Sequence, residues 1–174
     1  MSTASAKILV SSADCSAWIQ ISGRANFASS VDFKTLVNGL HEEGCRRFAL
    51  DLTSCVLMDS TFLGVLAGFG LMKNPGGASD KCDIELASPN ARVSELLENL
   101  GVLPLFKVTV GPLQLPGDVE ACTPELGSHT QKEITQTSLE AHQTLMAAHP
   151  DNVARFKDVA QFLAEDLKNL EKAS

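Results

Sequence analysis

A short apolar strand that leads almost directly into an apolar helix constrains the fold of this chain most. Phe48, Ala49, Leu50 and Leu52 form a β-compatible apolar run, which is typical of a strand inside a sheet covered on both faces. The helix predicted at 61–72 is apolar at almost every position. Such a helix is either buried all round or keeps one apolar side for a partner.

Asp59, Ser60 and Thr61 lie at the junction of this strand and helix. A helix N-terminus carries free backbone N–H groups and the positive end of the helix dipole, so it can hold a phosphate added to one of the hydroxyls. These residue types are also common helix N-caps. The junction therefore indicates either a phosphorylation switch or an ordinary cap.

The predicted helix carries three glycines, Gly64, Gly68 and Gly70. Each costs about 1 kcal/mol relative to Ala in a helix interior, so we expect them to allow close approach of another backbone. Val65 and Met72 are seven residues apart and lie on roughly the same side of the helix. We expect both to face outward and to contact a partner.

Strands and helices alternate through the first two thirds of the chain. Ser29 or Ser30 is expected to cap the first helix, and Gly44 to end it. The alternation predicts an α/β fold with a mixed or largely parallel sheet and helices packed against it. Besides the elements above, we expect strands at 7–10, 17–22, 82–87 and 106–110, a loop at 73–81, and helices at 30–43 and 90–100.

Residues 111–127 contain three prolines and three glycines and break this pattern. Beyond them, two helices are expected at 130–148 and 152–171, joined near Pro150. Such a hairpin cannot bury much core alone, so it docks on the first domain, dimerises or holds a partner. The predicted organisation is a domain at 1–112, a linker at 113–127 and a helical hairpin at 128–174. The predicted apolar seam of the second helix is Val153, Phe156, Ala160, Leu163, Leu167 and Leu170, and that of the first is Ile134, Ala141 and Leu145.

Composition excludes several classes of function. The formal net charge of −7 argues against binding nucleic acid or an anionic membrane through bulk electrostatics. No apolar run approaches the roughly 20 residues that span a bilayer, and the segment MSTASAK lacks a charged start followed by an apolar stretch, so we expect a cytoplasmic protein without membrane insertion. The five cysteines are scattered and include no CxxC pair, so we expect reduced thiols and neither metal nor cofactor.

Enzymatic motifs are missing from the sequence. Met58 and Phe62 stand where a Gly-x-Ser-x-Gly hydrolase motif would need glycines around Ser60. There is no Gly-x-Gly-x-x-Gly or Walker sequence. Three histidines, His129, His142 and His149, lie in the polar helical tail, where we expect them to be solvated. We therefore expect a protein that is not an enzyme.

The segment MDSTFLGVL, preceded by FALDLTSC, resembles the signature of the STAS family, the domain of bacterial anti-sigma factor antagonists. In that family a strand ending in Asp-Ser-Ser/Thr-Gly-Leu leads into a helix. WIQISGRANF resembles the family's early strand and its Gly-Glu-Leu-Asp turn, and ASPNARVSELLENLGVLPLF resembles its closing helix and last strand. The resemblance covers residues 7–110. This chain departs from the pattern at Phe62, where Gly is usual, and at Asn26, where Asp is usual.

The resemblance implies a phosphorylation-controlled regulator. Ser60, with Thr61 as the fallback, would be phosphorylated by a kinase-type anti-sigma factor or related serine kinase, and a phosphatase would remove the phosphate. Asn26, Asp59, Phe62, Val65 and Met72 would join Ser60 and Thr61 in binding the partner. Two alternatives stay open: a constitutive scaffold or lipid-transporter accessory subunit without phosphorylation, and a nucleotide-binding sensor. A homodimer through the C-terminal helices is a further alternative.

Overall fold

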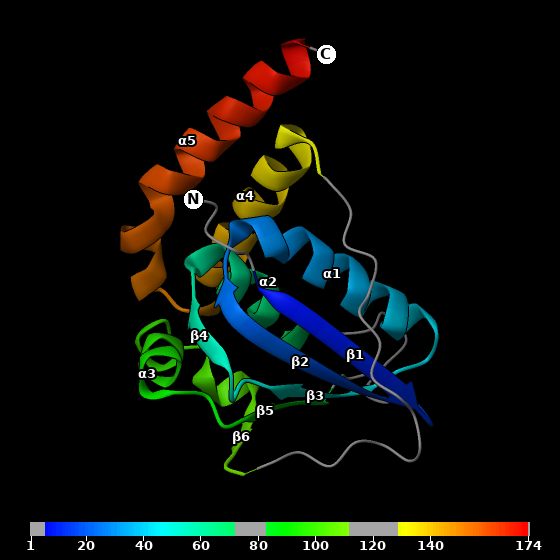
Figure 1. The fold of residues 1–174 in the computed structure, drawn as a ribbon. Coiled ribbons are helices and arrows are strands. Elements are labelled where there is room, and N and C mark those ends of the chain that lie inside the picture. The colour runs from blue at the N-terminus through cyan, green and yellow to red at the C-terminus, as the bar shows by residue number, and fades with distance from the viewer. Residues whose placement is uncertain (1–5, 72–82, 112–128, 174) are drawn as a thin grey trace.

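A single mixed sheet forms the centre of the molecule (Figure 1). The computed structural model describes residues 6–71, 83–111 and 129–173. Within them the sheet has six strands in the order β1-β2-β3-β5-β6, with β4 paired to β2. Among these described strands only the β1–β2 pair is antiparallel, so the predicted α/β fold with a largely parallel sheet is confirmed. The strands are β1 (Lys7–Ala13), β2 (Ser16–Ala25), β3 (Arg47–Asp51), β4 (Cys55–Met58), β5 (Asp83–Ala87) and β6 (Lys107–Thr109).

Helices pack in layers outward from this sheet (Figure 1). Helices α1 and α2 contact each other and the strands, α4 packs on α2 and α1, and α5 packs on α4 and extends beyond the body of the molecule (Figure 1). Helix α3 lies beside β4. The helices are α1 (Phe27–Glu42), α2 (Ser60–Gly70), α3 (Ala91–Asn99), α4 (Gln131–Ala148) and α5 (Asp151–Ala173), with a short 3-10 turn, η2, at Leu103–Leu105.

Large apolar side chains fill the space between the sheet and helices α1 and α2. Phe33 of α1 and Phe62 of α2 meet with ring centroids 4.8 Å apart, and both are fully buried. Ile19 of β2, Leu50 of β3 and Leu86 of β5 point into the same core and are equally buried. This dense packing fixes α2, and with it the Asp59-Ser60-Thr61 junction, relative to the sheet.

Helix α1 begins earlier than the sequence analysis predicts. Its N-cap is Asn26, whose side chain accepts hydrogen bonds from the N–H groups of Ala28 and Ser29. The N–H of Asn26 donates in return to the Ser29 hydroxyl, which completes a capping box. The expectation that Ser29 or Ser30 is the cap is therefore wrong, because Asn26 provides the first acceptor three residues upstream.

Strand β4 is an element that the sequence analysis did not predict. The Asp51 carboxylate accepts from the N–H and hydroxyl of Thr53, which turns the chain after β3. Residues Cys55–Met58 then pair with the far end of β2, whose first half pairs with β3. The short strand escaped prediction because its partner is a strand extension that no local pattern marks.

The C-terminal hairpin docks on the rest of the molecule, which answers one of the alternatives left open by the sequence. At the corner between α4 and α5, His149 lies against Gly101, where a Cβ would come within 2.5 Å of the imidazole Cδ2. Gly101 also has a φ of +71°, so this position needs glycine for two reasons. Asn152, which is fully buried, donates to the carbonyls of Leu100 and Leu145 and so joins the corner to the end of α3.

The predicted seam of α5 is only partly buried. Ala160 is buried and Phe156 packs against the core, but Val153 is 46% exposed. The predicted linker at 113–127 and the predicted loop at 73–81 lie outside the described residues. Among the helices of the described part, none combines the length and apolar character that a bilayer span requires.

Candidate functional site

Ser60 is the first residue of α2, directly after the N-cap Asp59. Strand β4 leads into this turn, and the N–H of Asp59 donates to the carbonyl of Ala25 at the end of β2. The start of α2 therefore lies beside the start of α1, at the edge where β2 and β4 end.

The Asp59 carboxylate connects the two helix N-termini. It accepts from the N–H of Phe62, within α2, at 2.8 Å and from the N–H of Phe27, at the start of α1, at 2.7 Å. Burial raises the pKa of this carboxyl, while the hydrogen bonds from the two backbone N–H groups oppose that shift. Asp59 thus fulfils the capping role that the sequence analysis considered, and it leaves both neighbouring hydroxyls free for other contacts.

The Ser60 hydroxyl is hydrogen-bonded to a histidine of the C-terminal hairpin. Its Oγ lies 2.8 Å from Nε2 of His142 in α4. The other ring nitrogen, Nδ1, lies 2.6 Å from the backbone carbonyl of Ser138, which can only accept. In the neutral ring the proton therefore sits on Nδ1, and Nε2 accepts a hydrogen bond from the Ser60 hydroxyl.

Two further contacts hold α4 against the first turns of α2. The hydroxyls of Thr61 and Ser138 lie 2.9 Å apart and are buried. At Gly64, a Cβ would stand 2.3 Å from the backbone oxygen of Ala141, so only glycine permits this approach of the two helices. The prediction that glycines in this helix admit another backbone is confirmed at Gly64.

Charged pairs surround this contact between α2 and α4. Lys34 of α1 donates to Glu140 of α4 at 2.6 Å. Burial opposes ionisation of Glu140, but hydrogen bonds from Lys34 and Gln136 outweigh it and lower its pKa. Near the start of α4, His129 pairs with Asp32 of α1 at 2.5 Å, and this hydrogen bond raises the pKa of the imidazole.

The other predicted partner-binding residues have diverse positions. Asn26 is half-buried at the start of α1, next to Asp59. Phe62 is fully buried in the core, so it offers no surface in this conformation. Val65 was expected to face outward but is only 8% exposed, beside a small hollow that α1, α2 and α4 share. Met72 lies outside the described residues.

His142 is the site residue that sequence reasoning missed. It was expected to be solvated, but it is 4% exposed and its ring meets Phe156 of α5 edge to face at 5.1 Å between centroids. His129 is also largely buried against Asp32. The available signal was that His142 lies three residues before Leu145, one of the predicted seam residues of α4, and residues three apart share one side of a helix.

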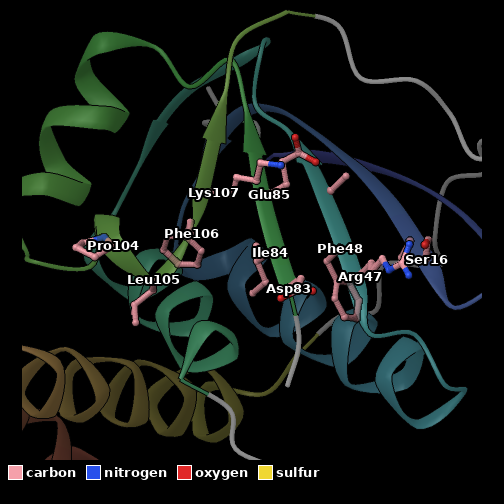
Figure 2. A pocket seen from close by; sticks show the side chains of 12 residues that line it. Ser16, Arg47, Phe48, Asp83, Ile84, Glu85, Pro104, Leu105, Phe106 and Lys107 are labelled. Carbon is pink, nitrogen blue, oxygen red and sulfur yellow. The ribbon is translucent and has the colours of Figure 1, made fainter. Parts of the chain in front are cut away.

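A larger hollow lies at the opposite end of the parallel strands. It has a volume of about 560 Å³ and lies where β2, β3, β5 and β6 begin (Figure 2). Phe48, Ile84 and Phe106 supply apolar lining, as Figure 2 shows. Its charged side chains are balanced, two basic and two acidic, so they favour no anion or cation: Arg47, Lys107, Asp83 and Glu85. Within the described ranges no cluster of three or more His, Cys, Asp or Glu side chains is placed to hold a metal ion.

Comparisons with known proteins identify the fold. No family profile matches the sequence, and no curated protein matches it either. Among solved structures, an anti-sigma factor antagonist from Mycobacterium paratuberculosis matches with a TM-score of 0.50 and 12% identity, over 60% of this chain and 85% of the other. The chain therefore has the STAS fold that the sequence resemblance implied.

Two further solved structures match somewhat less well. The anti-sigma factor antagonist SpoIIAA in its unphosphorylated form gives a TM-score of 0.48 and 12% identity, over 58% of this chain and 86% of the other. A Thermotoga maritima protein assigned to the same class gives a TM-score of 0.49 and 21% identity, over 57% of this chain and 83% of the other.

Proposed function

We propose that this chain is a phosphorylation-controlled binding protein of the anti-sigma factor antagonist kind. With Ser60 unphosphorylated it binds a kinase-type anti-sigma factor through the surface of α2, and a phosphatase restores this state after phosphorylation. The observation that carries the proposal is the position of Ser60, the first residue of a helix in a STAS fold, with a hydroxyl that the N-cap does not use.

The electrostatics of the junction support a switch by added charge. A phosphate brings about 1.5 to 2 negative charges to Ser60. It would lie one residue from the Asp59 carboxylate, whose pKa burial already raises. The added repulsion and desolvation would weaken a partner held at this surface, and about 3 to 4 kcal/mol would lower the affinity by two to three decades.

The proposal is tested by capture and phosphorylation. Wild type, Ser60→Ala and Ser60→Asp serve as baits, and captured kinases are identified by mass spectrometry. The recovered serine kinase with ATP should add one phosphate to wild type and none to Ser60→Ala, while Thr61→Ala is labelled like wild type. Equal labelling of wild type and Ser60→Ala would exclude Ser60 as the acceptor.

The hydrogen bond between Ser60 and His142 also favours a second candidate. A serine that is already satisfied within the chain suits a constitutive scaffold or transporter accessory subunit in which Ser60 has only a structural role. Phosphopeptide analysis of the protein isolated from its own cells separates the two, because the scaffold requires no phosphate on the peptide that contains Ser60.

A further inference from the structure

We propose that α4 is a built-in competitor for the partner-binding surface of this protein. The surface consists of Ser60, Thr61 and Gly64 and is called the α2 surface below. The inference rests on the proposed function, since it takes the α2 surface to be where the partner binds. It adds that this surface fits a helix with small and hydroxyl side chains, and that α4 occupies it within the same chain (Figure 1).

The fit between α4 and the α2 surface is continuous along one side of each helix. Each residue of the surface has its own counterpart within a five-residue stretch of α4: Ser60 with His142, Thr61 with Ser138, and Gly64 with the backbone of Ala141. A partner of ordinary bulk could not approach Gly64 while Ala141 lies there. Binding of α4 and binding of a partner helix therefore exclude each other.

The same contact hinders phosphorylation of Ser60. The transfer forms a bond from Oγ to the γ-phosphorus of ATP, breaks the bond to ADP and releases the hydroxyl proton. In the docked state the Ser60 hydroxyl donates a hydrogen bond to Nε2 of His142, and the 2.8 Å between Oγ and Nε2 leaves no space for a phosphoryl group on the side that faces α4. Release of α4 opens that side of Ser60 to a kinase.

The composition of this interface permits α4 to separate while the sheet stays folded. Of the six buried residues of α4, only Ala141 and Leu145 are apolar; the others are Thr135, Thr137, Ser138 and His142. Hydroxyl and imidazole groups exchange their hydrogen bonds with water at modest net cost, whereas the large apolar side chains of the core cannot. The described contacts at the α4–α5 corner, centred on Asn152, would keep the released hairpin near its site.

Thiol labelling tests the release of α4 without any partner. In full-length Ser60→Cys, alkylation of position 60 by N-ethylmaleimide is followed by peptide mass spectrometry. Adding Gly64→Ala places a methyl group against Ala141 and should raise the labelling rate about ten-fold or more. Gly68→Ala is the matched control, because its methyl group would meet only the Thr144 methyl at 3.9 Å, an ordinary contact, and should leave the rate unchanged.

The same spectra report whether the sheet stays folded. Cys55 of β4 is 1% exposed and should remain unlabelled in every variant. If Cys55 stays protected and Gly64→Ala leaves the labelling of position 60 unchanged, the proposal is overturned. If Gly64→Ala labels Cys55 as well, hydrogen exchange of the wild type decides: α4 amides less protected than those of β2 and β3 support release, and equal protection overturns it.

Binding to the serine kinase recovered above then tests the competition. Ala141→Asp changes α4 and leaves the α2 surface intact, so it should bind the kinase about ten-fold more tightly than wild type. Gln143→Asp, on the exposed side of α4, should bind like wild type. Suppose that wild type is phosphorylated at Ser60, but the variants change neither the thiol labelling of position 60 nor kinase binding. The proposal that α4 competes for the α2 surface is then overturned, while the proposed function stands. If position 60 becomes accessible yet no variant binds or is phosphorylated, the proposed function fails.

Discussion

The core between the sheet and α1 and α2 differs in kind from the interface between α2 and α4. The first is built from large apolar side chains such as Phe33 and Phe62. The second is built from a helix-to-helix approach at Gly64, hydrogen bonds between small polar side chains, and flanking ion pairs. One face of α2 therefore holds the domain together, and the other makes contacts that water or a partner can replace.

The largest effect is expected in the core. Phe62→Ala should reduce the free energy of unfolding by about 3–5 kcal/mol, because it removes a fully buried ring that packs against Phe33. Phe162→Ala is the same change at a position 67% exposed on α5, and it should cost less than about 0.5 kcal/mol. Urea unfolding measures both, and similar losses in the two variants would contradict the contrast between core and hairpin.

A smaller effect is expected at the corner of the hairpin. Asn152→Ala leaves the carbonyls of Leu100 and Leu145 without their buried donor, at a cost of about 1–3 kcal/mol. The loss should appear as faster hydrogen exchange in α4 and α5, with β2 and β3 unchanged. Asn169→Ala, at an exposed position of α5, is the control and should leave the pattern as in wild type. Uniformly faster exchange throughout the sheet would show that hairpin and core are one cooperative unit.

The smallest effect is a pH dependence at the start of α4. The hydrogen bond from His129 to Asp32, aided by Glu133, raises the pKa of the imidazole above its ordinary 6.5. The folded state thus binds the proton more tightly than the unfolded state. Its stabilisation is complete below about pH 6.5 and is lost as the pH rises through the raised pKa.

The pH dependence is measured by urea unfolding between about pH 6 and pH 9. Wild type should lose more stability over this range than Asp32→Asn, which keeps the side-chain size but removes the charge that holds the proton. Identical pH profiles for the two proteins would show that the pair contributes nothing to holding α4.

Sequence patterns located most of the core because apolar periodicity is a local property. The run at Phe48 to Leu52 and the apolar helix after Ser60 both occur as predicted, within a few residues at their ends. The start of α1 was misplaced because the strongest capping acceptor was Asn26, three residues before the serines that looked like caps. Strand β4 was missed because its pairing depends on how far β2 extends, which neighbouring residues do not specify.

By itself, the sequence determined the α/β fold, the place of Ser60 at a helix N-terminus and the presence of a C-terminal helical hairpin. Only the tertiary structure decided that the hairpin lies on α2, that Val65 is buried, and that the Ser60 hydroxyl is hydrogen-bonded to His142. The physical reason is how far apart the interacting residues lie along the sequence. Helices, strands and caps follow from residues a few positions apart, whereas the contact of Ser60 with His142 joins residues 82 positions apart through helix packing.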